Sequence, residues 1–233
     1  MTIDINTHKN VLLKILKDLY TDPFLGPLLG FKGGTAAYLF YGLNRFSVDL
    51  DFDLLDDKKE EEVFSRAEAV VKKHGVIKDR MNKKHTLFLH LSYAKEAQNI
   101  KVEINKRVFN SRYGVGNYLG ISMLVMKKED MFAHKLVAMT ERKKTANRDI
   151  FDVHFFLNNN WGINREIVEK RTAIKFIDYL KKCINFVDNI SDREILAGIG
   201  ELLDEKQKTW VKTKLKTDTI FLLRLMLDSE KTK

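Results

Sequence analysis

The strongest constraint on the fold of this chain is a strict two-residue alternation in the segment SVDLDFDLL, residues 47–55. Asp49, Asp51 and Asp53 fall on one face of the segment, and apolar residues fall on the other face. This period predicts a β-strand whose apolar face is buried. Carboxylates stacked on one face repel one another, so such a strand calls for a divalent cation beside it.

A glycine-rich turn precedes this strand. Gly33, Gly34 and Thr35 open a short apolar helix, and the strand begins thirteen residues after Thr35. Backbone N–H groups at the start of a helix attract anions, and glycine lets an anion approach them closely. Either motif alone also occurs as an ordinary turn or as an acidic strand edge. Together they predict nucleotide chemistry, because Mg²⁺ commonly binds one or two carboxylates along with substrate phosphates.

A change of apolar periodicity divides the chain into two predicted domains. The elements expected in residues 1–120 are a helix over 7–20 capped by Thr7, the strand over 47–55, a helix over 56–75, and strands over 85–94 and 99–108. In residues 121–233, apolar residues recur at three- and four-residue steps, which predicts helices throughout. The predicted fold class is therefore α/β (α+β), with a sheet domain followed by an all-helical domain.

Composition narrows the setting. With 44% hydrophobic residues the chain can bury a sizeable core, and it contains no apolar run near the ~20 residues of a membrane-spanning helix. The single cysteine, Cys183, fits a reducing compartment, so we expect a soluble cytoplasmic protein. A net charge of +9 is compatible with a phosphate-rich partner such as RNA, although lysine-rich proteomes also yield basic proteins.

Two blocks of the sequence resemble a known family. The string KGGTAAYLFYGLNRFSVDLDFD (32–53) is similar to the signature of the AbiEii/AbiGii toxin branch of the polymerase-β-like nucleotidyltransferases. Lys135, followed by RDIFD (148–152), resembles a second motif of that branch. The resemblance implies a nucleotidyltransferase fold with a mixed sheet in residues 1–120. It also implies transfer of a nucleoside monophosphate from an NTP, with Mg²⁺ or alternatively Mn²⁺, by the toxin of a toxin–antitoxin pair.

The same resemblance implies roles for individual residues. The catalytic residues would be Asp49, Asp51, Lys135 and Asp149, with Asp152 as the alternative to Asp149. The nucleotide would be held by Lys32, Gly33, Gly34, Thr35, Ser47 and Lys135. The metal would be bound by Asp49, Asp51 and Glu103, with Asp53 in a supporting role. Glu103 is chosen because both of its neighbours are apolar and point to the opposite face of a strand.

Several alternatives remain at this stage. Glu103 could instead be a surface acid paired with Lys101 or Lys106, and Lys135 could be a structural lysine that reaches the helix surface. The stretch KQKTWVKTKLK (206–216) is either a solvated connection between helices or an RNA contact with Trp210 available for stacking. The acceptor would be tRNA or another RNA, with an antitoxin as a further partner. A small molecule of the aminoglycoside type is the competing acceptor, and a catalytically idle NTP-binding or interaction module is the third reading.

Overall fold

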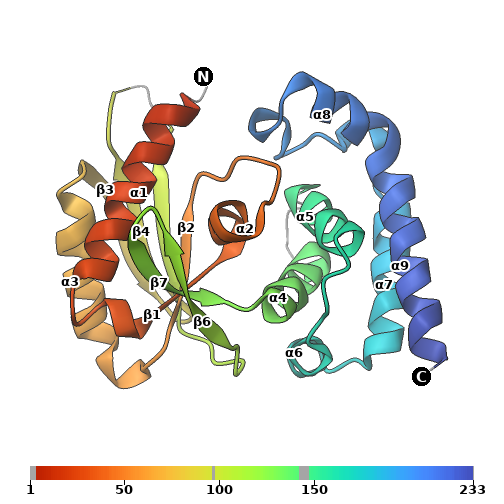
Figure 1. Ribbon diagram of the computed structural model, residues 1–233, viewed down its shortest axis with the longest axis horizontal. Coiled ribbons are helices and arrows are strands. Elements are labelled where there is room, and N and C mark those ends of the chain that lie inside the picture. Colours follow the sequence, from red (N-terminus) through yellow and green to blue (C-terminus); the bar gives the residue numbers. More distant parts are fainter. Residues whose placement is uncertain (1–3, 96–97, 142–146, 233) are drawn as a thin grey trace. The chain divides into compact units, whose positions relative to one another are not determined.

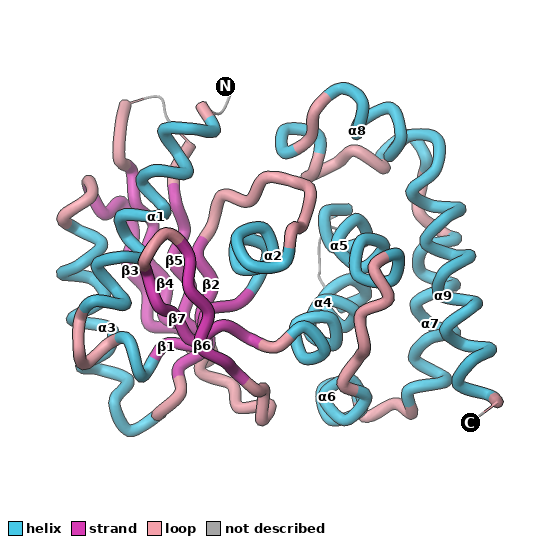
Figure 2. The backbone as a smooth tube through the Cα atoms, in the orientation of Figure 1, coloured by secondary structure: helices cyan, strands magenta, loops and turns pink. Residues whose placement is uncertain are grey.

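The computed structural model describes residues 4–95, 98–141 and 147–232 (Figure 1). The chain forms two compact units. The first comprises Met1–Val108 and Arg112–Lys127, and the second comprises Phe109–Ser111 and Lys128–Lys233. Figure 2 shows that the strands lie in the first unit and that the second unit is built from helices. The fold class predicted from the sequence is confirmed.

The first unit is built on a seven-stranded sheet in the order β3-β4-β5-β2-β1-β7-β6. Its strands are β1 (Leu29–Lys32), β2 (Leu50–Leu54), β3 (Val76–Lys83), β4 (Thr86–Ser92), β5 (Ile100–Asn105), β6 (Tyr113–Tyr118) and β7 (Ile121–Met126). β2 pairs antiparallel with β1 and parallel with β5, so the sheet is mixed. This pairing makes β2, the alternating aspartate strand, a central strand of the sheet.

Three helices accompany the sheet, namely α1 (Ile5–Thr21), α2 (Gly33–Tyr41) and α3 (Glu60–Lys72), with short 3-10 turns at Gly26–Leu28 and Asp57–Lys59. The apolar face of the sheet carries Phe31 and Phe52, which are buried neighbours on β1 and β2. Phe52 lies near Tyr20 of α1 and Phe31 lies near Phe40 of α2, with ring centroids 6.3 and 6.4 Å apart. The apolar half of the alternating pattern therefore forms the core of this unit.

Two predictions for this unit need correction. The cap of α1 is Asp4 and not Thr7, because the Asp4 carboxylate accepts hydrogen bonds from the backbone N–H groups of Asn6 and Thr7. The segment 121–126, predicted to belong to the helical domain, instead forms β7. β7 pairs with β1 and β6, and five of the six residues of its sequence ISMLVM are apolar, so it shows no polar–apolar alternation by which a two-residue period could be recognised.

The second unit is helical. Its helices are α4 (Lys128–Glu141), α5 (Asn147–Asn158), α6 (Arg165–Thr172), α7 (Phe176–Asp188), α8 (Glu205–Trp210) and α9 (Lys216–Lys231), with 3-10 turns at Asp192–Glu194 and Gly200–Leu202. Phe156 stacks on Trp161 at 4.1 Å between ring centroids, and Phe132 packs edge-on against Phe156. In the described part of the chain, no helix has both the length and the apolar character needed to cross a membrane.

The lysine-rich stretch 206–216 is helical and is not an extended connection. A π-helical turn over Val211–Leu215 joins α8 to α9. Trp210 packs against His154 and Phe151, with ring centroids 4.7 and 6.0 Å apart. Its ring is half-buried and contributes to the packing of this unit.

Candidate active site

Two of the predicted metal ligands are neighbours on adjacent strands. Asp51 of β2 lies directly opposite Glu103 of β5 in the parallel ladder, on the polar face of the sheet. The pKa of Glu103 lies above its ordinary value, chiefly because the side chain is buried and then because Asp51 and Asp49 repel its charge. Lys101 and Lys83 offset this shift only in part. The sheet thus gathers three acids in an arrangement that resists full ionisation.

The glycine turn lies against this acid group. Gly33 has φ +78°, a conformation that glycine adopts without strain, and it is the first residue of α2. A Cβ at this position would overlap the carboxylate of Asp51. Position 33 therefore requires glycine for two reasons, its positive φ and the lack of room for a Cβ. Without a side chain there, Asp51 lies beside the N-terminal N–H groups of α2.

Asp49 is fixed at the start of β2 by its neighbours. The hydroxyl of Thr35 donates to the backbone carbonyl of Asp49, and the backbone N–H of Lys101 donates to Asp49 Oδ1 at 3.2 Å. Thr35, predicted to hold the triphosphate, is buried and uses its hydroxyl to attach α2 to β2. Its side chain is placed to position Asp49.

Ser47 and Arg45 lie at the second glycine of the turn. A Cβ on Gly34 would lie 2.8 Å from Ser47 Oγ and 2.9 Å from Arg45 Nη2. Arg45 is buried and donates from Nη1 to the carbonyl of Phe46 at 2.9 Å. Ser47, predicted to bind the nucleotide, therefore lies beside the turn, and Arg45 is an additional cation there that was not singled out from the sequence.

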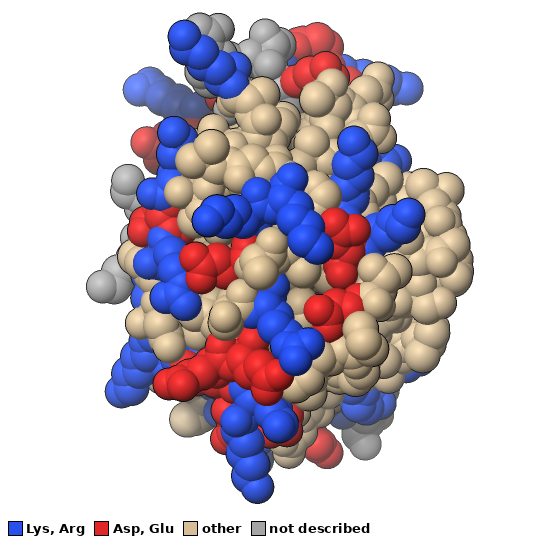
Figure 3. Space-filling view, turned by 90° about the vertical axis from the view of Figure 1, so that its left-hand side faces the viewer, with Lys and Arg blue, Asp and Glu red and all other residues tan. Residues whose placement is uncertain are grey.

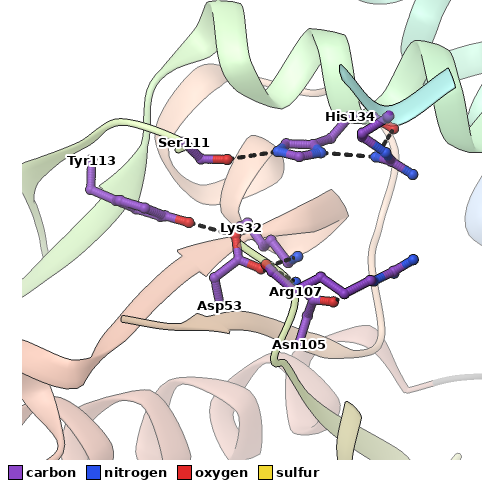
Figure 4. A network of polar contacts seen from close by, with 8 residues as sticks. Lys32, Asp53, Asn105, Arg107, Ser111, Tyr113 and His134 are labelled. Carbon is purple, nitrogen blue, oxygen red and sulfur yellow. Dashed lines mark hydrogen bonds and ion pairs between the residues drawn. The ribbon is translucent and has the colours of Figure 1, made fainter. Parts of the chain in front are cut away.

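Asp53 does not join the acid group. It is buried and accepts hydrogen bonds from Lys32 Nζ and Tyr113 Oη, both at 2.5 Å, and from Asn105 Nδ2 at 2.7 Å (Figure 4). Burial alone would raise the pKa of Asp53, but the charge of Lys32 and these three hydrogen bonds outweigh it and leave the pKa lowered. Lys32, predicted to bind the nucleotide, is the ion-pair partner of Asp53.

Tyr113 reaches Asp53 across a gap left by a glycine. Tyr113 belongs to β6 at the edge of the sheet, two strands away from β1, and Gly30 of β1 lies directly opposite Asp53. A Cβ on Gly30 would overlap the Tyr113 ring. The sequence analysis missed Tyr113 and Asn105, although a lone glycine within a strand signals such a close approach.

His8 of α1 forms a hydrogen bond with the backbone of Val48, the residue before Asp49. Its Nε2 lies 3.0 Å from the carbonyl of Val48, so Nε2 carries the hydrogen, and Nδ1 accepts from Tyr93 Oη at 2.9 Å. Burial lowers the pKa of His8, against the opposing effects of the Val48 hydrogen bond and the charge of Asp49. A neutral imidazole therefore ties α1 to the beginning of the aspartate strand.

The second sequence block forms an ion-pair cluster inside the second unit. Lys135 Nζ of α4 lies 2.9 Å from Asp149 Oδ1 and 3.0 Å from Asp152 Oδ2, both on α5. The three side chains are 12%, 1% and 0% exposed. The ammonium group of Lys135 therefore does not reach the surface of the unit. It forms ion pairs with both candidate aspartates, Asp149 and Asp152.

A second cluster in this unit, also drawn in Figure 4, surrounds His134. Arg171 Nη1 lies 2.8 Å from His134 Nδ1, so that nitrogen accepts and the hydrogen is on Nε2. Nε2 lies 2.7 Å from Ser111 Oγ and donates to it. A histidine in this tautomer cannot take a proton from the serine, so the pair is not a nucleophile with its base.

The donor set suits a hard divalent ion. Among the described residues, no group of three or more His, Cys, Asp or Glu side chains stands close enough to hold a metal by itself. Mg²⁺ does not require such a cage, since one or two carboxylates and the substrate phosphates suffice. Asp49 and Asp51 supply those carboxylates, and the start of α2 beside Asp51 supplies backbone N–H groups for a phosphate. The residues present therefore fit a metal that arrives with its nucleotide.

Comparison with known proteins shows the family to which the chain belongs. The family model described as nucleotidyl transferase AbiEii toxin, Type IV toxin–antitoxin system, matches residues 14–214. The chain therefore belongs to the AbiEii nucleotidyltransferase toxin family, and it is a nucleotidyltransferase. No curated protein matches the chain.

Two solved structures share the fold over the whole chain. A candidate nucleotidyltransferase from H. pylori has a TM-score of 0.65 at 23% identity, covering 100% of this chain and 99% of the other. JHP933 from Helicobacter pylori has a TM-score of 0.60 at 21% identity, covering 100% and 96%. At these identities the likeness concerns the fold alone.

Proposed function

We propose that this protein transfers a nucleoside monophosphate from an NTP to a hydroxyl group of an RNA, most simply the acceptor end of a tRNA, in the cytoplasm. The observation that carries the proposal is the contact between the Gly33 backbone and the Asp51 carboxylate. This closeness supports a phosphate-binding role for the start of α2 beside carboxylates that would hold a metal. The raised pKa of Glu103 supports the same assignment, because it marks an acid group short of positive charge.

In this proposal each residue has a definite task. The N–H groups of Gly33 and Gly34 bind the triphosphate, and Asp49 and Asp51, with Glu103 beside them, hold Mg²⁺ or alternatively Mn²⁺. When bound, the ion neutralises phosphate charge and acidifies the acceptor hydroxyl. The acceptor hydroxyl gives up its proton to solvent, its oxygen bonds to the α-phosphorus, the bond from that phosphorus to the β-phosphate oxygen breaks, and pyrophosphate leaves.

The remaining predicted residues act by positioning. Thr35 attaches α2 to the backbone at Asp49, Ser47 lies beside the glycine turn, and Lys32 neutralises Asp53. We assign Lys135 and Asp149 a supporting role from the second unit, where they lock α4 to α5.

The metal-site assignment is tested by Asp49→Asn and Asp51→Asn. Each should abolish transfer of label from [α-³²P]NTP while leaving the thermal melt intact, because each removes one negative charge from a repelling group. Asp57→Asn, which changes an exposed acid at the start of a 3-10 turn, is the matched control and should retain full activity. Normal transfer by either active-site variant would remove the assignment.

The acceptor is tested at the lysines of 206–216. Lys212 and Lys214 are exposed, whereas Lys208 pairs with Glu205 at 2.7 Å, so the variant is Lys212→Glu with Lys214→Glu. If these lysines contact RNA phosphates, tRNA labelling should fall and its salt dependence should weaken by about 0.7–0.9 of a log–log unit per lost contact. Lys14→Glu with Lys17→Glu, which reverses two exposed lysines of α1, is the charge-matched control. If wild-type protein labels no RNA under any condition, a small molecule replaces RNA as the acceptor.

Membership of a toxin family makes an antitoxin partner part of the proposal. Expression of the wild-type chain in a bacterium should arrest growth, and expression of Asp51→Asn should not. Co-expression of the reading frame adjacent to the native gene should relieve the arrest. Growth inhibition that is equal for wild type and Asp51→Asn would show that any toxicity is unrelated to nucleotidyl transfer.

A further inference from the structure

A pocket of about 580 Å³ with both polar and apolar lining residues lies in the second unit, where α7 ends and the 3-10 turn Asp192–Glu194 follows. Its volume falls within the ~300–1,000 Å³ typical of small-molecule sites. The lining residues that matter are Asn147, Lys182, Asn185, Phe186, Asn189 and Glu194. None of them belongs to the site on the sheet.

The most buried polar residue of the pocket is Asn147, which is 2% exposed. Its Nδ2 donates to the carbonyl oxygen of Glu194 at 2.5 Å, and because that neighbour is an acceptor, the orientation of the amide is fixed. The Oδ1 atom is buried and has no hydrogen-bond partner among the described residues. Buried acceptors are almost always satisfied, so this atom, which the surrounding side chains close off from solvent, favours a ligand that brings an N–H or O–H donor to it as the pocket wall adjusts.

The other lining residues describe that ligand. Lys182, Asn185 and Asn189 follow one another at helical spacing along a single face of α7. An ammonium group suits a phosphate, and amides both donate and accept, as base edges do. Phe186 adds a half-buried ring on which a base can stack, and the carboxylate of Glu194 can accept from sugar hydroxyls or base amino groups. An inorganic anion would not use the ring, and an apolar ligand would not use three amides.

We infer that this pocket binds one nucleotide with an unpaired base, either as a free mononucleotide or as a residue of single-stranded RNA. Cation, aromatic ring and amides are the groups with which proteins hold unstacked nucleotides. This binding goes beyond the proposed transfer reaction and needs no metal, since the pocket contains a single carboxylate.

The test measures binding in EDTA with the Asp51→Asn protein, so that the sheet site contributes least. The probes are AMP, CMP, GMP and UMP by calorimetry and a short fluorescein-labelled single-stranded RNA by anisotropy. The double variant Lys182→Ala with Asn185→Ala, and separately Phe186→Ala, should weaken binding at least about tenfold. Lys181→Ala should bind as well as the parent, because that neighbouring lysine pairs with Asp178 and lies outside the pocket.

The outcomes distinguish a free mononucleotide from an RNA residue as the ligand. They also distinguish binding in this pocket from binding at the acids of the sheet. Mononucleotide binding that depends on Lys182 and Asn185 identifies a free nucleotide as ligand, and RNA binding alone with the same dependence identifies an RNA residue. No binding of either probe, or equal affinity in parent and double variant, overturns the inference. Neither result alters the transfer assay, and a failed transfer assay would leave this binding unaffected.

Discussion

The two units contain acid clusters that differ in how their charge is balanced. In the second unit, Asp149 and Asp152 lie within 3.0 Å of Lys135, so the protein supplies its own cation. On the sheet, burial and then the charges of Asp51 and Asp49 raise the pKa of Glu103, and the lysines near Glu103 do not balance this shift. The first arrangement is typical of a structural element and the second of a site that recruits a cation from outside.

Asp53 shows that this difference comes from neighbours and not from strand geometry. It lies on β2 two residues beyond Asp51 and points to the same face, yet its pKa is lowered because Lys32, Tyr113 and Asn105 overcome the effect of burial. One strand therefore carries both kinds of carboxylate. The lesson is that spacing gathers acids on a face, and contacts from other strands determine which of them are left for a metal.

The largest expected effect on stability is at the ion-pair cluster of Lys135, Asp149 and Asp152. Lys135→Met should lower the free energy of unfolding by about 3–5 kcal/mol, because it leaves two buried carboxylates without their cation. Urea denaturation measures the change. Adding Asp149→Asn and Asp152→Asn to the same variant should restore most of the loss if charge is its cause. A triple variant no more stable than Lys135→Met would show that packing is responsible instead, and the comparison would fail.

The next largest effect is an increase in the free energy of unfolding when NTP and Mg²⁺ bind at the acids of the sheet. NTP at about 100 times its dissociation constant should stabilise the fold by about 2.7 kcal/mol when Mg²⁺ is present, and much less in EDTA. Thermal-shift scans over the four NTPs measure it, and Asp51→Asn should remove the metal-dependent part. Equal shifts with and without metal would favour the idle binding module over the enzyme.

Asp53→Asn should cost about 2 kcal/mol at neutral pH, since it removes the charged acceptor of Lys32. The folded pKa of Asp53 is below its ordinary value of 3.8, so its contribution is present above that pH and is lost as the pH falls through the folded pKa. Unfolding free energies of wild type and variant should therefore converge in strong acid. A difference that stays constant down to that range would mean that Asp53 acts without its charge.

Glu103→Gln should have the smallest effect and the opposite sign, a gain of up to about 1 kcal/mol at neutral pH without metal. The folded pKa of Glu103 is raised above 4.5, so its ionisation lowers stability as the pH rises through that window, and the gain should disappear below about pH 4.5. Unfolding curves at several pH values in EDTA measure it. A loss of stability at neutral pH would show that Glu103 is already paired with a cation of the protein.

The sequence by itself determined the aspartate strand, the glycine turn before it and most of the helices. These are local patterns, in which the period of the apolar residues and the lack of a side chain at Gly33 already limit the backbone. It also indicated Glu103, because two apolar neighbours fix the face of the strand to which its side chain points. The predicted end of the sheet domain at residue 120 was wrong. Five of the six residues of β7 are apolar, so its sequence shows no alternation that marks it as a strand.

Only the tertiary structure decided what each charged group is next to. Asp53 looks like Asp49 and Asp51 in the sequence, but Tyr113 reaches it from β6, sixty residues later in the chain. Lys135 looks like a nucleotide ligand, but α5 brings two aspartates to it. The interaction between charges depends on distance and burial, and neither can be read from positions that lie far apart along the chain.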